Sequence, residues 1–150
     1  MSERHKADRI MDAALERIGE ISRLEGGVHR ARAYPHPEDA LPAASVYLGT
    51  DDPTELASSG IGHIDSRLTL RVAVATRGSL EAIDAELLEL RRAVTCALMR
   101  DPRLGLEWVI DTREGAAAEP EIDPQGRQPV AFQELVFLVD YRRSREDPAQ

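Results

Sequence analysis

The sequence predicts an α+β fold, a two-layer sandwich in which two helices cover one face of a mainly antiparallel or mixed sheet. Two segments with apolar residues at steps of three and four predict helices, and five segments with apolar residues at every second position predict strands. Along the chain these elements follow the order α-β-β-β-α-β-β. The 150 residues contain no internal repeat and have the length of one domain, so we expect a single domain spanning 1–150.

The first helix is predicted over Ser2–Glu25. Ser2 can accept hydrogen bonds from the first free amides, and Gly26 and Gly27 favour a helix end because glycine adopts the left-handed conformation without steric cost. The stripe expected to face the core consists of Ile10, Met11, Ala14, Leu15, Ile18 and Ile21.

Three strands are predicted next, over Val28–Tyr34, Ala43–Leu48 and Ile64–Arg77. Pro35 ends the first strand because proline cannot donate to a ladder of backbone hydrogen bonds. The segment 49–62 has no periodicity and predicts a long loop. The third strand has the clearest alternation, and its buried face is expected to be Leu68, Leu70, Val72 and Val74.

The second helix is predicted over Leu80–Arg100, with Ser79 as its N-cap. A helix that connects two strands of one sheet can place those strands parallel. The core stripe of this helix is expected to be Ile83, Leu87, Leu90, Val94 and Ala97.

The last two strands are predicted over Leu104–Ile110 and Val130–Tyr141, with a loop over Glu114–Gln128 between them. Apolar residues on both faces of the final strand predict a central place in the sheet. The charged end of the chain, 142–150, is expected to be a flexible tail.

Composition excludes several classes of function. The 27 acidic and 19 basic side chains give a net charge of −8, which disfavours direct binding to nucleic acid. Apolar runs are too short for a membrane span or a secretory signal. Cys96 is the only cysteine, so neither an intramolecular disulfide nor a cysteine-built metal site can form, and we expect it to be a small buried apolar residue.

No motif in the chain predicts an enzyme, a cofactor or a metal. The four histidines lack metal-ligand spacing, and the acidic run at Asp51 lacks the spacing of a calcium loop. No serine or glycine pattern matches a hydrolase or a phosphate-binding loop. The alternative from another class is a small-ligand-binding domain, whose signature would be a deep pocket where Asp111, Glu134 and His63 converge.

The charges are unevenly placed along the chain. The segment from His36 to Ser66 carries six acids and no Lys or Arg, and Glu114–Asp123 carries four acids and no base, whereas arginines gather on the strands and at the C-terminus. Such a layout suits head-to-tail association of copies, and a solvated charged surface explains it equally well. The candidate interface residues are Asp51, Asp52, Glu55, Arg67, Arg71, Arg142 and Arg143.

Four stretches of the chain carry a family resemblance: RARAYPHPEDALPAASVYLG, SRLTLRVAVATRG, GSLEAIDAELLELRRAVTCALMRDPRLGL and AFQELVFLVDYRR. Together with the order of elements, they make the chain resemble the bacteriophage tail terminator proteins, also called minor tail protein U-like or tail-completion proteins. The resemblance spans Ile10 to Arg142 and includes no catalytic motif.

The resemblance implies a structural protein of the virion, located in the tail or neck and assembled in the host cytoplasm. Such proteins cap the tail tube, stop its polymerisation and form the joining surface for the head, as hexameric rings through which DNA passes without specific binding. The implied partners are further copies of the chain, the tail tube protein and the head–tail connector protein, with no membrane. The alternative within this class is a head–tail joining protein of the neck.

Overall fold

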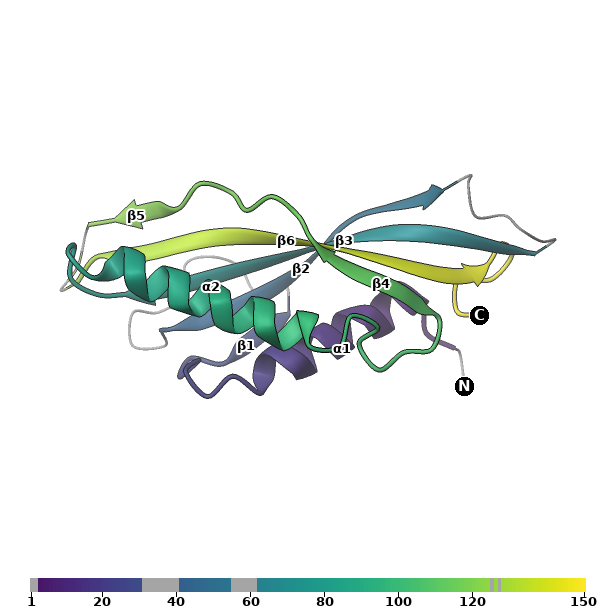
Figure 1. The fold of residues 1–150 in the computed structure, drawn as a ribbon, viewed down its shortest axis with the longest axis horizontal. Helices are drawn as coiled ribbons and strands as arrows, with labels where there is room; N and C mark the ends of the chain where they lie inside the picture. The colour runs from purple at the N-terminus through teal and green to yellow at the C-terminus, as the bar shows by residue number, and fades with distance from the viewer. Residues whose placement is uncertain (1–2, 31–40, 55–61, 125, 127) are drawn as a thin grey trace.

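The computed structural model describes residues 3–30, 41–54, 62–124, 126 and 128–150. Two helices lie along one face of a six-stranded mixed sheet, which confirms the predicted α+β fold and its order of elements (Figure 1). One short strand, β5, adds to that order. The elements are α1 (Lys6–Gly19), β1 (Val28–Arg30), β2 (Ala43–Thr54), β3 (His63–Arg77), α2 (Ile83–Met99), β4 (Val109–Glu114), β5 (Glu121–Asp123) and β6 (Val130–Ser144).

The strand order in the sheet is β1-β2-β3-β6-β4, and β5 also pairs with β6. Among the strand pairs of the described residues, only β1–β2 is parallel. Because β3 and β4 are both antiparallel to β6, they run in the same direction, as predicted for the strands that α2 connects. The final strand β6 is central, which agrees with its apolar residues on both faces.

The core lies between the sheet and the helices, on the face that the alternation predicts. All four expected residues of β3 are buried, and so are the apolar residues at alternate positions of β6. The helices contribute a matching stripe. The central residues of this core are Ile10, Met11, Ala14, Ile18, Leu68, Leu70, Val72, Val74, Leu87, Leu90, Val94, Leu135, Phe137 and Val139.

Helix α1 is shorter than the predicted Ser2–Glu25. It begins after His5, whose ring Nδ1 accepts a hydrogen bond from the backbone N–H of Ala7 at 3.0 Å, and the predicted cap Ser2 lies outside the described residues. Turns follow Gly19, so the glycine pair comes after the helix end rather than at it. The predicted first strand is observed up to Arg30, and its remainder lies outside the described residues.

Helix α2 begins three residues later than predicted. Ser79 is not its N-cap; that position is Ala82, which makes no side-chain capping hydrogen bond, and Ser79 lies in the turn before it. At the other end Leu98 is buried, whereas the predicted Ala97 is only half-buried, because it lies at the side of the stripe that lines a surface groove. Cys96 is exposed, so its predicted burial is wrong.

Strand β2 continues to Thr54, into the predicted loop 49–62. Its pairing with β3 shifts between Leu48 and Asp51, so Gly49 and Thr50 together lie opposite Thr69 in a β-bulge. A Cβ on Gly49 would lie 2.6 Å from the backbone oxygen of Thr69, so this position requires glycine. The extra residue also reverses the alternation, which is why the sequence pattern is lost here.

Strand β4 covers Val109–Glu114, whereas the prediction was Leu104–Ile110. Residues 101–108 form turns instead, with positive φ at Leu104 (55°) and Gly105 (70°). The carboxylate of Asp101 accepts hydrogen bonds from the backbone N–H groups of Arg103 and Gly105. Leu104 is buried by this turn, so a packed turn produced the apparent strand pattern.

Strand β6 extends to Ser144, past the predicted end at Tyr141. Arg142 and Arg143 therefore belong to a strand rather than to a terminal tail. Beyond the strand, the backbone C=O of Pro148 accepts a hydrogen bond of 2.9 Å from the N–H of Lys6, which brings the end of the chain to the start of α1.

We predict that Gly49→Ala destabilises the protein by about 1–3 kcal/mol, since the added methyl group overlaps the backbone of Thr69. Chemical denaturation of the variant and the parent measures the difference. The control is Gly78→Ala, where the nearest atom lies 3.9 Å from the added Cβ, and its stability should stay within about 0.5 kcal/mol of the parent. Equal stabilities of the two variants would contradict a sterically required bulge.

Candidate assembly surfaces

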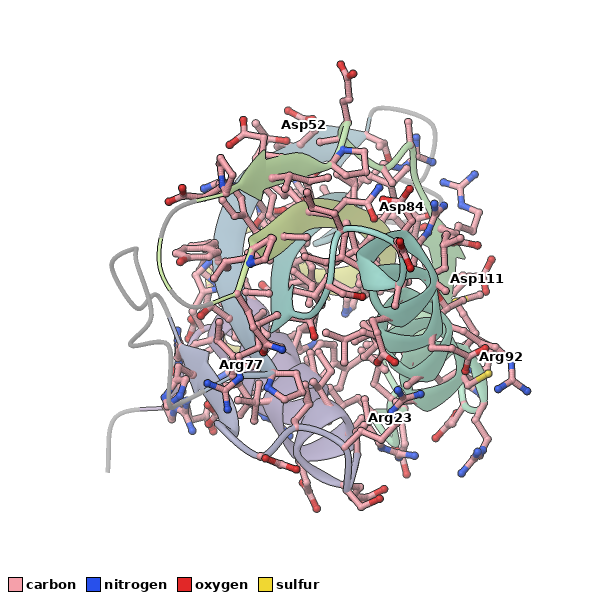
Figure 2. The ribbon with its side chains drawn as sticks, turned by 90° about the vertical axis from the view of Figure 1, so that its left-hand side faces the viewer. Arg23, Asp52, Arg77, Asp84, Arg92 and Asp111 are labelled. Atoms are coloured by element: carbon pink, nitrogen blue, oxygen red, sulfur yellow. The ribbon has the colours of Figure 1, made fainter. Side chains whose placement is uncertain are left out.

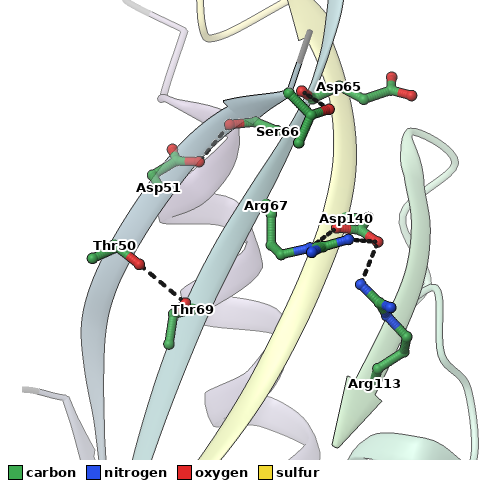
Figure 3. Close-up of polar contacts among 9 residues, drawn as sticks. Thr50, Asp51, Asp65, Ser66, Arg67, Thr69, Arg113 and Asp140 are labelled. Atoms are coloured by element: carbon green, nitrogen blue, oxygen red, sulfur yellow. Dashed lines mark hydrogen bonds and ion pairs between the residues drawn. The ribbon is translucent and has the colours of Figure 1, made fainter. Parts of the chain in front are cut away.

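Five of the seven candidate interface residues lie on the strands at one end of the sheet. There β2, β3 and β6 continue past the start of α1, so this part of the sheet projects beyond the helix layer (Figure 1). We call it the distal end, comprising residues 50–54, 63–69 and 138–144. Polar side chains link its three strands (Figure 3).

Asp51 is held inside the distal end rather than presented to solvent. The bulge turns its side chain to the face of Ser66 and Tyr141, which lie opposite each other in the β3–β6 register. The Asp51 carboxylate accepts hydrogen bonds of 2.6 Å from the hydroxyl groups of both residues. Burial, together with the bond to Asp51, raises the pKa of the Tyr141 phenol.

Arg67 lies on the opposite face of the sheet, in a network centred on Asp140 (Figure 3). Its Nε donates to Asp140 Oδ1 at 2.8 Å, and Arg113 Nη2 donates to the other carboxylate oxygen at 3.1 Å. The hydrogen bond to Asp140 raises the pKa of Arg67, and nearby Asp52 contributes in the same direction. One carboxylate thus serves two cations from neighbouring strands.

Arg142 and Arg143 point to opposite faces of β6 because they are consecutive in a strand. Arg142 makes a two-pronged pair with Asp65, with N–O distances of 2.8 and 3.3 Å, which raises the pKa of Arg142. Arg143 lies on the same face as Tyr141. It donates from Nη1 to the backbone oxygen of Ser144, while its buried Nε has no hydrogen-bond partner among the described residues.

Arg71 lies further along β3, away from the distal end. Its guanidinium is 5.6 Å from the ring centre of Tyr47 and 3.6 Å from a carboxylate oxygen of Glu134. These three side chains line a cavity of about 350 Å³ on the sheet face opposite the helices, which Phe132 and Glu119 also line.

The structure therefore brings together five of the seven candidate residues, Asp51, Asp52, Arg67, Arg142 and Arg143, and places Arg71 apart from them. Asp52 is exposed, and Glu55 lies outside the described residues. Arg67, Arg71 and Arg142 are paired with carboxylates of their own chain. Contact of these residues with a neighbouring copy stays a prediction. To form it, the arginines would have to leave their present carboxylates or bind a carboxylate of the neighbour in addition.

Sequence reasoning missed a cation–aromatic stack beside the distal end. Lys6 Nζ lies 5.0 Å and the Arg9 guanidinium 5.1 Å from the ring centre of Trp108, and Tyr141 meets the same indole edge-on. Burial lowers the pKa of Lys6, with a further contribution from Arg9. The i, i+3 spacing of the two cations indicates that they lie on the same face of α1. Their aromatic partner, Trp108, could not be anticipated, because it lies in a turn that was predicted to be a strand.

Sequence reasoning also missed a groove on the outer surface of the helix layer, with a volume of about 390 Å³. We call it the helix groove. It lies between the end of α1 with the following turn and the second half of α2. Apolar atoms of Ile21, Ala93 and Ala97 and the exposed Cys96 line it, and its cations are Arg17, Arg23, Arg92 and Arg100.

The cavities do not support a convergent ligand site. Glu134 lines the cavity near Arg71, whereas His63 lines a different cavity of about 530 Å³ near Trp108, and Asp111 lines neither. Within the described ranges, no three His, Cys, Asp or Glu side chains are placed to hold a metal ion. No helix in those ranges has the length and apolar character required to cross a membrane.

Comparison with known proteins gives a match in structure. The fold is similar to a chain of a solved structure described as the virion of a native gene transfer agent particle, with a TM-score of 0.56 and 18% identity. The match covers 89% of this chain and 95% of that chain. At this identity the likeness establishes the fold. No family model matches the sequence, and no curated protein matches it.

We predict that Tyr141→Phe costs about 1–3 kcal/mol at neutral pH, because a buried hydrogen bond to a carboxylate is lost. The raised pKa of Tyr141 adds a pH dependence. The unfolded phenol ionises near pH 10 while the folded one stays protonated, so parent stability falls as the pH rises above about 10.

Denaturant titrations at neutral pH and above pH 10 measure both effects. The alkaline loss of stability should be smaller in Tyr141→Phe than in the parent. Tyr47→Phe is the matched control, since it changes a half-buried tyrosine outside the core. An alkaline slope of equal size in the parent and in Tyr141→Phe would show that the Tyr141 phenol is not protected.

Proposed function

We propose that the chain is a structural protein of a phage-like particle that ends the tail. In this proposal it caps the tail tube as a hexameric ring, stops polymerisation of the tube and offers the joining surface for the head connector. The observation that carries the proposal is the shared fold with a chain of the gene transfer agent virion, which extends over nearly the full length of both chains.

The charged surface supports assembly rather than catalysis. Arginine–carboxylate pairs cover the sheet face opposite the helices, and the ionisable groups considered for a ligand site lie in separate cavities. A ring also needs two different complementary surfaces on each copy. The projecting distal end and the helix groove are our two candidates for such surfaces. We therefore propose a non-enzymatic role in the virion, with further copies, the tail tube protein and the connector as partners.

A head–tail joining protein of the neck is the second candidate. The shared fold favours it as much as a terminator, since both belong to virions. The two differ in partner, because a terminator must bind the tail tube protein as well as the connector, whereas a joining protein needs no contact with the tube.

We predict that the purified chain, mixed with the tail tube protein of its own particle, binds one end of the tubes and shortens them. Negative-stain imaging should show a six-fold ring at that end, and tube length should fall as the chain is added. A chain that stays monomeric and never binds tubes would contradict the terminator role. Binding to the connector alone would favour the neck protein.

A second prediction separates assembly from folding at the distal end. Asp52→Lys with Glu55→Lys should weaken ring formation several-fold, most visibly at low salt, since both carboxylates are candidates for contact with a neighbour's arginines. Asp51 is left unchanged because it holds Ser66 and Tyr141. Ring assembly is measured by imaging and sedimentation.

The matched control is Glu81→Lys with Asp84→Lys, which changes the net charge by the same amount at exposed positions just before and at the start of α2, outside the distal end and the helix groove. It should assemble like the parent. Equal loss of rings in both double variants would mean that net charge, not this surface, governs assembly.

A further inference from the structure

The helix groove combines an apolar floor with an excess of cations. Ile21, Ala93 and Ala97 supply the floor, while the lining holds four arginines and a single carboxylate, that of Glu20. Figure 2 shows Arg23 and Arg92 projecting outward on this side of the molecule. A groove of this kind fits an acidic segment that also carries apolar side chains.

The exposed arginines of the groove can accept a new partner at small cost. Arg17 forms a part-buried pair with Asp101 at 3.2 Å. Arg23 pairs with Glu86 at 3.2 Å and Glu89 at 3.5 Å, but these two pairs are solvent-exposed, and exposed pairs contribute little stability. Arg92 is 73% exposed and its contact with Glu89 is long, at 3.7 Å. Within the described part of the chain, Arg100 has no carboxylate at ion-pair distance.

The chain itself contains a segment with the complementary chemistry. Residues 114–123, from the end of β4 through β5, hold four acids, no base and three consecutive alanines. Glu119 and Glu121 are exposed and form no ion pair with any described residue, and Ile122 is 44% exposed. Hydrogen bonds from Gly115 and Ala118 to the backbone of β6 fix the segment in place. It is therefore ordered for docking.

The groove and the acidic segment lie on different surfaces of the molecule. The segment runs along the outer side of β6 and forms the edge of the sheet opposite β1, whereas the groove lies on the helix layer (Figure 1). One copy therefore presents the segment at a sheet edge and the groove on its helices. A contact that joins two different surfaces is head-to-tail, and it closes into a ring when the rotation between copies permits.

We propose that the helix groove binds the acidic segment 114–123 of a second copy of this chain. Glu119 and Glu121 face Arg92 and Arg100 across the contact, and Ala118, which lines the same cavity as these two glutamates, packs toward the apolar floor. The inference rests on the proposed ring, to which it adds the contact between neighbouring copies.

Cys96, the only cysteine, lies in the groove and serves as a probe. The native chain is mixed with a copy that carries Cys96→Ser and Ala118→Cys, which keeps all four acids of the segment. A short bis-maleimide then links thiols of different copies, at high protein concentration and low salt. Each copy has one cysteine, so every link joins two chains, and mass spectrometry of the linked peptides identifies the positions.

Links between positions 96 and 118 should exceed 96–96 and 118–118 links several-fold and should decrease as salt is added. The control copy carries Cys96→Ser and Ser79→Cys, an exposed uncharged position before α2, and should link to position 96 only at background level. A 96–118 yield no higher than this control would overturn the proposal.

Charge reversal provides an independent arm. Arg92→Glu with Arg100→Glu in the native-cysteine copy should remove the 96–118 link, and Glu119→Arg with Glu121→Arg in the other copy should restore it. All four positions are exposed, and circular dichroism verifies that the variants fold. A link that persists through the first reversal, or is not restored by the second, would contradict the assigned contact.

The outcomes separate this inference from the proposed function. Six-fold rings on tubes without 96–118 links would leave the terminator role in place and reject this contact. Links that respond to charge reversal without any ring or tube binding would establish the contact between copies and reject the terminator role.

Discussion

The structure depends on the antiparallel pairing of two 15-residue strands, β3 and β6, in register from His63 with Ser144 to Arg77 with Val130. Both strands carry apolar residues at alternate positions, so one face of the pair must be removed from water. The two helices cover that face, and the other strands attach to the two edges of the pair. Because the strands are longer than the helices can cover, the same pairing produces the projecting distal end.

Much of this arrangement could be predicted from the sequence, because regular periodicity reports which face of an element is buried. The core faces of α1, β3, α2 and β6 are examples. The failures occur where a local conformation changes the period. The bulge at Gly49 reverses the alternation of β2, and the turn at Leu104 and Gly105 buries a leucine in a pattern that resembles a strand. Neither conformation follows from periodicity alone.

The candidate surfaces were less predictable than the fold for a related reason. Charge counts along the chain correctly indicated acidic segments and arginine-bearing strands. The register between strands, however, decides which arginines already form an ion pair with a carboxylate of the same chain. Arg67 and Asp140 are far apart in sequence and adjacent in register, and the same is true of Arg142 and Asp65. The helix groove was missed because its arginines come from the end of α1, the turn after it, and the second half of α2 with its C-cap, and no local pattern describes how these segments pack together.

The bulge at Gly49 and Thr50 also bears on how related chains are to be compared. One additional residue opposite Thr69 decides whether the following carboxylate reaches Tyr141 or points away from it. In a homologue that lacks this residue, each side chain in the last part of the strand would point to the other face of the sheet, even if the rest of the sequence were identical. Insertions and deletions at this point therefore carry more structural information than substitutions, and an alignment that ignores a one-residue gap there would equate positions on opposite sides of the protein.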